Sequence, residues 1–134
     1  MRMIFVNLPV RDLEKSKDFF TAIGFSINPQ FTDENATSVV IDENIFVQLH
    51  THDHFRQFVT GEIGDAFQAT TVLNALSADS REEVDDIYAK ALAAGGREWK
   101  PPADHGFMYV VSFQDLDGHV WEVAWMDPAA MQQS

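Results

Sequence analysis

The chain has 134 residues, 46% of them hydrophobic, and this length predicts a single domain with a substantial core. It contains no cysteine, which excludes disulfides, thiolate metal sites and a cysteine nucleophile. The formal net charge of −12 disfavours binding to nucleic acid or to anionic membranes and is compatible with a cationic ligand. No apolar stretch reaches the roughly 20 residues of a membrane span, so we expect a cytoplasmic protein.

The first half of the chain predicts a strand, a helix and two further strands. Residues 3–10, MIFVNLPV, are rich in β-branched and aromatic side chains and predict a strand rather than a signal peptide. The following helix has Asp12 as its N-cap and Gly24 as its end. Residues 36–42 and 44–51 predict two short strands that are joined by a tight turn.

The second half predicts the same order of elements. Residues 70–78 form a strand, and the next helix begins with a capping box made by Ser80 and Glu83. The segments GFMYVVSFQ and HVWEVAWM predict two strands that are joined by a turn at 115–118.

A constant offset relates the two halves. A shift of 68 residues maps Asp12 onto Ser80 at the two helix caps, and a shift of 74 maps Gln48 onto Glu122 in the last strands. The chain is therefore predicted to contain two βαβββ repeats. The predicted boundaries are about 1–51 for the first repeat, 52–68 for a linker, about 69–127 for the second repeat and 128–134 for a C-terminal tail.

Both ends of this duplicated region resemble one known group of proteins. The segment FVNLPVRDLEKSKDFFTAIGF resembles the opening strand and helix of the vicinal oxygen chelate superfamily. The segment FQDLDGHVWEVAW resembles its closing strand pair, with Leu116 where proline is usual. The resemblance covers residues 1–127 and implies one α+β domain of the glyoxalase-like fold, in which two βαβββ repeats form a curved mixed sheet around a cavity. It also implies a homodimer.

The resemblance does not specify a reaction, because the superfamily includes glyoxalase I, extradiol dioxygenases, epimerases, fosfomycin-resistance enzymes and bleomycin-binding proteins. Its metal site takes one residue from the first and the fourth strand of each repeat, most often His, Glu, His and Glu. The resemblance places Phe5, Gln48, Leu73 and Glu122 at these positions. Phenylalanine and leucine offer no lone pair, so we expect no metal cofactor there. The alternative is a divalent ion held by Gln48 and Glu122.

The resemblance also predicts a binding site for a small molecule. The four positions, together with neighbours on the same strand faces, would line an apolar cavity that has a few polar groups. The predicted ligand-binding residues are Phe5, Asn7, Phe46, Gln48, His50, Leu73 and Glu122. Three roles for Glu122 stay open: an idle remnant of the metal site, a general base, or an anchor for a cationic or hydrogen-bond-donating ligand group.

Several polar residues outside this set invite a functional interpretation. The segment HTHDHF carries His50, His52 and His54, which could bind a transition metal, but its place at the start of the linker predicts an exposed polar segment. His105 lies in a loop where a ligand contact is conceivable, and His119 is expected to be structural.

Asp115 and Asp117 are interpreted as turn formers. The sequence thus predicts a small-molecule-binding member of the superfamily whose reaction is unknown. One alternative is a drug-sequestering resistance protein of the bleomycin type, for which the acidic charge would suit a cationic aromatic drug. The other is a divergent metal-dependent lactoylglutathione lyase or dioxygenase.

Overall fold

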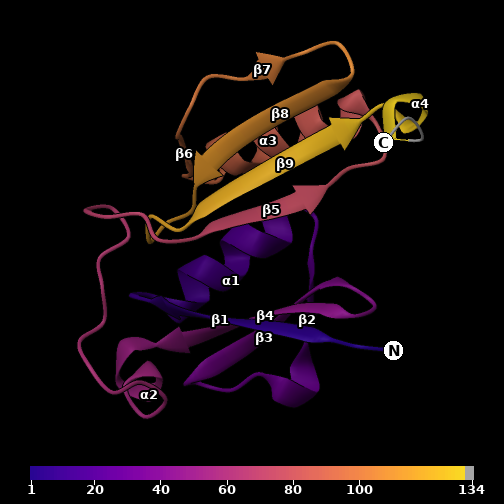
Figure 1. The fold of residues 1–134 in the computed structure, drawn as a ribbon. Coiled ribbons are helices and arrows are strands. Elements are labelled where there is room, and N and C mark those ends of the chain that lie inside the picture. The colour runs from indigo at the N-terminus through magenta and orange to yellow at the C-terminus, as the bar shows by residue number, and fades with distance from the viewer. Residues whose placement is uncertain (132–134) are drawn as a thin grey trace. The chain divides into compact units, whose positions relative to one another are not determined.

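The computed structural model describes residues 1–131 and shows two compact units, whose boundary falls between Asp65 and Ala66. Each unit consists of a mixed β-sheet with one main helix packed against it, which confirms the α+β class (Figure 1). The boundary lies inside the predicted linker 52–68.

The first unit is a four-stranded sheet. Its elements, in chain order, are β1 (Ile4–Val10), α1 (Leu13–Ala22), β2 (Ser26–Asn28), the 3₁₀ helix η1 (Pro29–Phe31), β3 (Ala36–Asp42), β4 (Ile45–Thr51) and α2 (His52–Phe55). The strand order is β1-β4-β3-β2, with β1 parallel to β4 and the other neighbours antiparallel. Helix α1 packs against β2, β3 and β4, and the short helix α2 contacts β1 and β4.

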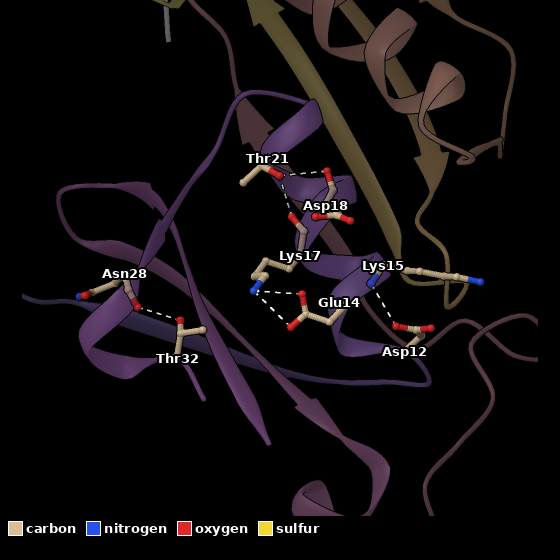
Figure 2. A network of polar contacts seen from close by, with 8 residues as sticks. All are labelled: Asp12, Glu14, Lys15, Lys17, Asp18, Thr21, Asn28 and Thr32. Carbon is tan, nitrogen blue, oxygen red and sulfur yellow. Dashed lines mark hydrogen bonds and ion pairs between the residues drawn. The ribbon is translucent and has the colours of Figure 1, made fainter. Parts of the chain in front are cut away.

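Helix α1 begins and ends where the sequence predicts. The Asp12 carboxylate accepts a hydrogen bond from the Lys15 backbone N–H at 3.1 Å (Figure 2), which satisfies one of the free donors of the first turn. Gly24 follows the helix with a φ of +113°, a conformation that suits glycine. On the exposed side, the Lys17 ammonium lies 3.2 Å from the Glu14 carboxylate (Figure 2).

The two faces of the first sheet differ in burial. The face toward α1 forms the core of the unit, with Leu8, Val10, Val39, Val47 and Leu49 packed near Phe19 and Phe20 of the helix. Because successive strand residues point to opposite faces, Phe5, Asn7, Phe46 and Gln48 lie on the other face. We call the sheet face away from the main helix of each unit its open face.

The second unit repeats this plan with one additional short strand. Its elements are β5 (Leu73–Ser77), α3 (Arg81–Ala93), β6 (Arg97–Glu98), β7 (Ala103–Asp104), β8 (Met108–Gln114), β9 (Val120–Met126) and α4 (Pro128–Met131). The strand order is β5-β9-β8-β6, and β7 also pairs with β8. Helix α3 covers β8 and β9 (Figure 1). In residues 1–131, no helix is long and apolar enough to cross a membrane.

Strand register confirms the internal repeat residue by residue. Ser80 caps α3 as Asp12 caps α1, by accepting a hydrogen bond from the backbone N–H of Glu83 at 3.1 Å. The predicted shifts carry register pairs of the first sheet onto register pairs of the second. Phe5–Phe46 maps onto Leu73–Val120, Asn7–Gln48 onto Ala75–Glu122, and Ser38–Gln48 onto Ser112–Glu122. Gln48 and Glu122 therefore occupy the same position in the two sheets.

The short edge strands were not located from the sequence. Strands β2, β6 and β7 have only two or three residues each, too few for an alternating pattern to be recognised. The strand predicted at 70–78 is shorter, Leu73–Ser77. The tail predicted at 128–134 begins with helix α4, and residues 132–134 lie outside the described part of the chain.

The turn that leads into β9 requires glycine at position 118. Gly118 has a φ of +87°, and a Cβ atom there would lie 2.7 Å from the backbone nitrogen of Phe67 and 2.8 Å from its Cγ. Real Cβ contacts of this length essentially never occur. The turn therefore combines a left-handed backbone with close packing against the segment before β5, and it fixes where β9 begins.

Candidate functional site

The open face of the first sheet carries an aromatic pair. Phe5 on β1 and Phe46 on β4 are register partners, and their rings stack with centroids 5.1 Å apart and an interplanar angle of 13°. Phe5 nevertheless remains 50% exposed. This pair therefore presents a flat apolar surface on which a planar ligand group could stack.

Polar side chains continue this face beyond the aromatic pair. Gln48 lies on β4 between its register partners Asn7 on β1 and Ser38 on β3. Ser38 is buried, Gln48 is half-buried and Asn7 is exposed. The amide and hydroxyl groups supply hydrogen-bond donors and acceptors beside the apolar surface, as in a small-molecule site.

His50 joins this face to helix α2. Its Nε2 atom lies 2.8 Å from Asn7 Oδ1, and its Nδ1 atom lies 2.9 Å from His54 Nδ1. His50 is only 6% exposed, so the expectation of an exposed polar segment was wrong for this residue. Desolvation, followed by the charge of His54, lowers the pKa of His50 below its usual value of 6.5.

Helix α2 positions His54 against the end of β4. Thr51 caps this helix by accepting a hydrogen bond from the His54 backbone N–H at 3.3 Å. Phe55 and Phe58 place their ring centroids 5.9 and 5.3 Å from that of His50. This contact could not be predicted from the histidine pattern, because it depends on the chain turning from strand to helix at Thr51.

The open face of the second sheet carries Glu122 and Leu73. Glu122 on β9 is half-buried between Ala75 on β5 and Ser112 on β8. Leu73 is 49% exposed next to Val120. Trp121, which precedes Glu122, is buried on the opposite face under α3, in agreement with the predicted alternation.

The residues at the four inherited metal positions do not fit a divalent ion. Phe5 and Leu73 are hydrocarbons, so only the Glu122 carboxylate and the Gln48 amide could donate electron pairs. Family sites of this kind need about three good protein ligands. Residues 1–131 contain no group of three or more His, Asp or Glu side chains arranged to hold a metal ion.

Asp115 forms the turn before β9, as predicted, and also anchors a buried tryptophan. Its Oδ1 accepts hydrogen bonds from the backbone N–H groups of Asp117 and His119 at 2.9 and 3.0 Å. Its Oδ2 accepts one from Trp121 Nε1 at 3.0 Å. Burial raises the pKa of Asp115, whereas these hydrogen bonds favour its charged form. The tryptophan contact was not predicted, because the sequence alone does not show that the Trp121 side chain reaches back to Asp115.

The remaining histidines lie in turns of the second unit. His105 is exposed between β7 and β8, where its backbone N–H donates to Met108 O at 2.8 Å. His119 is half-buried, and its carbonyl accepts a hydrogen bond from the Asp115 N–H at 3.0 Å. This hydrogen bond places the His119 backbone in the turn before β9, and the structural role expected for its side chain stays a prediction.

A guanidinium network near α3 was also missed by sequence analysis. Arg81 donates two hydrogen bonds to the Asp104 carboxylate at 2.8 and 2.9 Å, and one to Gly106 O. Its guanidinium also lies over the rings of Tyr109 and Trp125. The Arg81 hydrogen bonds are the main reason why the pKa of Asp104 is lowered to about 2. This network ties the short strand β7 to the start of α3.

Comparison with known proteins places the chain in a family. Residues 2–42 match the family model described as Bleomycin resistance protein-like N-terminal. The chain is 31% identical to a hypothetical protein of S. aureus whose structure is solved. The match covers 93% of this chain and 94% of the other chain, with a TM-score of 0.79. A glyoxalase/bleomycin resistance protein/dioxygenase family enzyme from Burkholderia phytofirmans shares the fold, with a TM-score of 0.76, 18% identity and coverage of 94% and 99%. The chain belongs to the vicinal oxygen chelate superfamily.

More distant members of the superfamily share the fold alone. The fosfomycin resistance protein FosX from Listeria monocytogenes matches with a TM-score of 0.68 and 20% identity, and the match covers 96% of both chains. No curated protein matches the chain. These structural matches confirm the fold that the two sequence ends implied, and they leave the reaction open.

Proposed function

We propose that this vicinal oxygen chelate protein binds small organic molecules on the open face of each sheet, without a metal ion at the four positions that the resemblance assigns to one. The observation that carries the proposal is the pair of hydrocarbon side chains, Phe5 and Leu73, at the two positions for which the resemblance to the superfamily implies imidazoles. Both side chains are half exposed on their sheet faces. Such residues contribute apolar contact to a ligand and nothing to a metal ion.

The open face of the first sheet favours an aromatic ligand group, and that of the second sheet favours a cationic one. The Phe5–Phe46 stack offers a flat apolar surface with about half of Phe5 exposed. In residues 1–131, no hydrogen bond or ion pair engages the Glu122 carboxylate, so it can accept a donor from a ligand. The net charge of −12 attracts cations to the whole molecule. On the first sheet, Gln48 and the second N–H of the Asn7 amide would add hydrogen bonds that orient the bound molecule, and His50 holds that amide in place through Nε2.

The match to a bleomycin resistance-like family model favours sequestration as the form that this binding takes. A sequestering protein needs affinity and no reaction, which agrees with the loss of the inherited metal ligands. Under this interpretation Glu122 is a binding group. If the protein is instead an enzyme, Glu122 is its candidate general base, and the compound that it binds would be chemically changed.

Isothermal titration calorimetry with metal-free bleomycin tests the proposal. A phenylalanine side chain presents about 200 Å², so a ligand that covers the exposed half of Phe5 buries about 100 Å². At about 25 cal/mol per Å² this contributes about 2.5 kcal/mol, or about 60-fold in Kd, and about 10-fold if only half of that area is covered.

We therefore expect Phe5→Ala to weaken binding by about 10- to 60-fold. Phe31→Ala is the matched control, because Phe31 is an exposed phenylalanine of the same unit outside the open-face stack, and it should leave Kd unchanged. Glu122→Gln should weaken binding and reduce its salt dependence, whereas Glu62→Gln, at an exposed linker position, should not. Equal effects of Phe5→Ala and Phe31→Ala would overturn the proposal.

Mass spectrometry of the incubated compound separates binding from catalysis. An unchanged compound supports sequestration, and a product that disappears in the Glu122→Gln variant supports the enzyme alternative. The metal-dependent lyase or dioxygenase alternative has a separate signature. A divalent ion that survives dialysis in the natural protein and is lost in Glu122→Gln would contradict a metal-free site.

A further inference from the structure

Two imidazole groups meet at the end of the first sheet, outside the inherited metal positions. His50 from β4 and His54 from α2 place their Nδ1 atoms 2.9 Å apart. Their ring centroids are 5.0 Å apart with an angle of 32° between the planes. The two nitrogen atoms come from different elements and face each other across a single hydrogen bond, whose proton a metal ion could replace once the rings rotate to direct both lone pairs at it.

The neighbouring hydrogen bonds fix which ring nitrogen of His50 carries a proton. The Asn7 Nδ2 group donates to Phe5 O at 3.1 Å, so Asn7 Oδ1 is the atom that faces His50. A carbonyl oxygen only accepts, and His50 Nε2 must therefore donate to it. In the neutral ring this leaves a lone pair on His50 Nδ1, directed at His54.

We propose that His50 and His54 bind one divalent transition-metal ion through their Nδ1 atoms. Metal-ligating histidines almost always donate their other ring N–H to an acceptor, which orients the ring and raises its basicity. The Asn7 amide already fills this role for His50, and Phe5 O holds the amide in turn. His54 would move its proton from Nδ1 to Nε2, which is the ordinary change of tautomer.

The separation of the two nitrogen atoms indicates which ions fit. A metal–nitrogen bond of about 2.05 Å and a nitrogen–nitrogen distance of 2.9 Å together give an angle of about 90° at the metal. Tetrahedral coordination would need a separation of about 3.3 Å at the same bond length. Square-planar or tetragonal coordination has angles of 90° and is typical of Cu²⁺ and Ni²⁺ with nitrogen ligands. Binding of Cu²⁺ or Ni²⁺ therefore needs a smaller change in the separation of the two nitrogen atoms than binding of Zn²⁺.

A nearby carboxylate supports a cation at the pair. Asp33 is close enough for its charge to interact with His54, and this carboxylate would partly offset the charge of the ion. Phe55 and Phe58 border the imidazoles, and Phe58 is 64% exposed, so water can reach the pair. With two protein ligands, water must complete the coordination sphere, so we expect micromolar rather than nanomolar affinity. The site goes beyond the proposed ligand binding and does not depend on it.

Titration of tag-free protein with Cu²⁺ and Ni²⁺ at pH 7.5 tests the proposal by calorimetry and, for Cu²⁺, by electron paramagnetic resonance. We expect one ion per chain, with a tetragonal spectrum and coupling to two nitrogen nuclei. His54→Gln should lower the affinity at least 10-fold and leave coupling to one nitrogen. His52→Gln is the matched control, because it lies in the same helix and has no part in the pair.

A further variant distinguishes a ligand from a supporting residue. Asn7→Ala should weaken binding by about 10-fold while the coupling to two nitrogen nuclei persists, because Asn7 orients His50 and does not touch the ion. Circular dichroism and urea unfolding check that each variant is folded. Affinity that is the same in the natural protein and in folded His54→Gln would overturn the proposal, as would the absence of binding at 100-fold excess of ion over protein.

Discussion

Replacement of Gly118 by alanine tests whether the turn before β9 is as closely packed as its geometry indicates. Gly118 has a φ of +87°, and a Cβ atom would meet Phe67 at 2.7 Å from its backbone nitrogen and at 2.8 and 2.9 Å from its ring carbons. Two separate penalties therefore apply. One is the left-handed backbone, and the other is the steric contact with Phe67.

The two penalties can be given magnitudes. An alanine in the left-handed region costs about 1–2 kcal/mol, and overpacking of a filled space costs about 1–3 kcal/mol. The lower entropy of the unfolded alanine chain offsets about 0.4–1 kcal/mol. For Gly118→Ala we therefore expect a loss of about 3 kcal/mol in the free energy of unfolding, a large fraction of the 5–15 kcal/mol typical of a domain.

Gly106→Ala is the control that separates the penalties. Gly106 has a similar φ of +80°, but nothing lies within 4 Å of the position of its Cβ atom. Only the backbone penalty applies there, so the expected loss is about 1 kcal/mol. Urea unfolding followed by circular dichroism measures both variants. Losses that agree within about 0.5 kcal/mol would refute the claim that contact with Phe67 makes glycine necessary at position 118.

Two more predictions concern carboxylates of the second unit. The Asp115→Asn substitution turns an amide N–H toward Trp121 Nε1, which is itself a donor and needs an acceptor. Urea unfolding should therefore show a loss of about 1–3 kcal/mol in the free energy of unfolding. Unchanged stability would mean that the contact is dispensable. The pKa of Asp104 is lowered from 3.8 to about 2, chiefly by Arg81, so its contribution to stability is complete above pH 3.8 and is lost as the pH falls toward 2. Carboxyl titration by NMR should give a midpoint near 2 that returns toward 3.8 in Arg81→Gln, and a midpoint near 3.8 in the natural protein would contradict this network.

The candidate ligand-binding residues illustrate how far the sequence could lead. Alternation along a strand assigns each side chain to one of two faces, so Phe5 and Phe46 could be placed on the same side before their contact was known. The sequence did not give the register between β1 and β4, and it is this register that makes them stacked partners. A shift of one residue in the register between β1 and β4 would have put the two rings on opposite faces of the sheet.

The histidine segment illustrates the opposite case. Its composition predicted an exposed polar linker, but His50 is buried because β4 extends to Thr51 and α2 folds back over the strand end. The same holds for Arg81 and Asp104, which are 23 residues apart and meet through two hydrogen bonds. Nothing in the local sequence of either residue indicates its partner.

The sequence by itself determined the two long helices α1 and α3, the long strands, the caps at Asp12 and Ser80, and the duplication that relates Gln48 to Glu122. These features depend on neighbours within a few residues or on a repeated pattern, so they are written locally in the chain. Only the tertiary structure decided that His50 meets His54 and Asn7, and that Asp115 holds Trp121. Such contacts require two elements to be placed within a fraction of an ångström, and strand register and packing set that placement together.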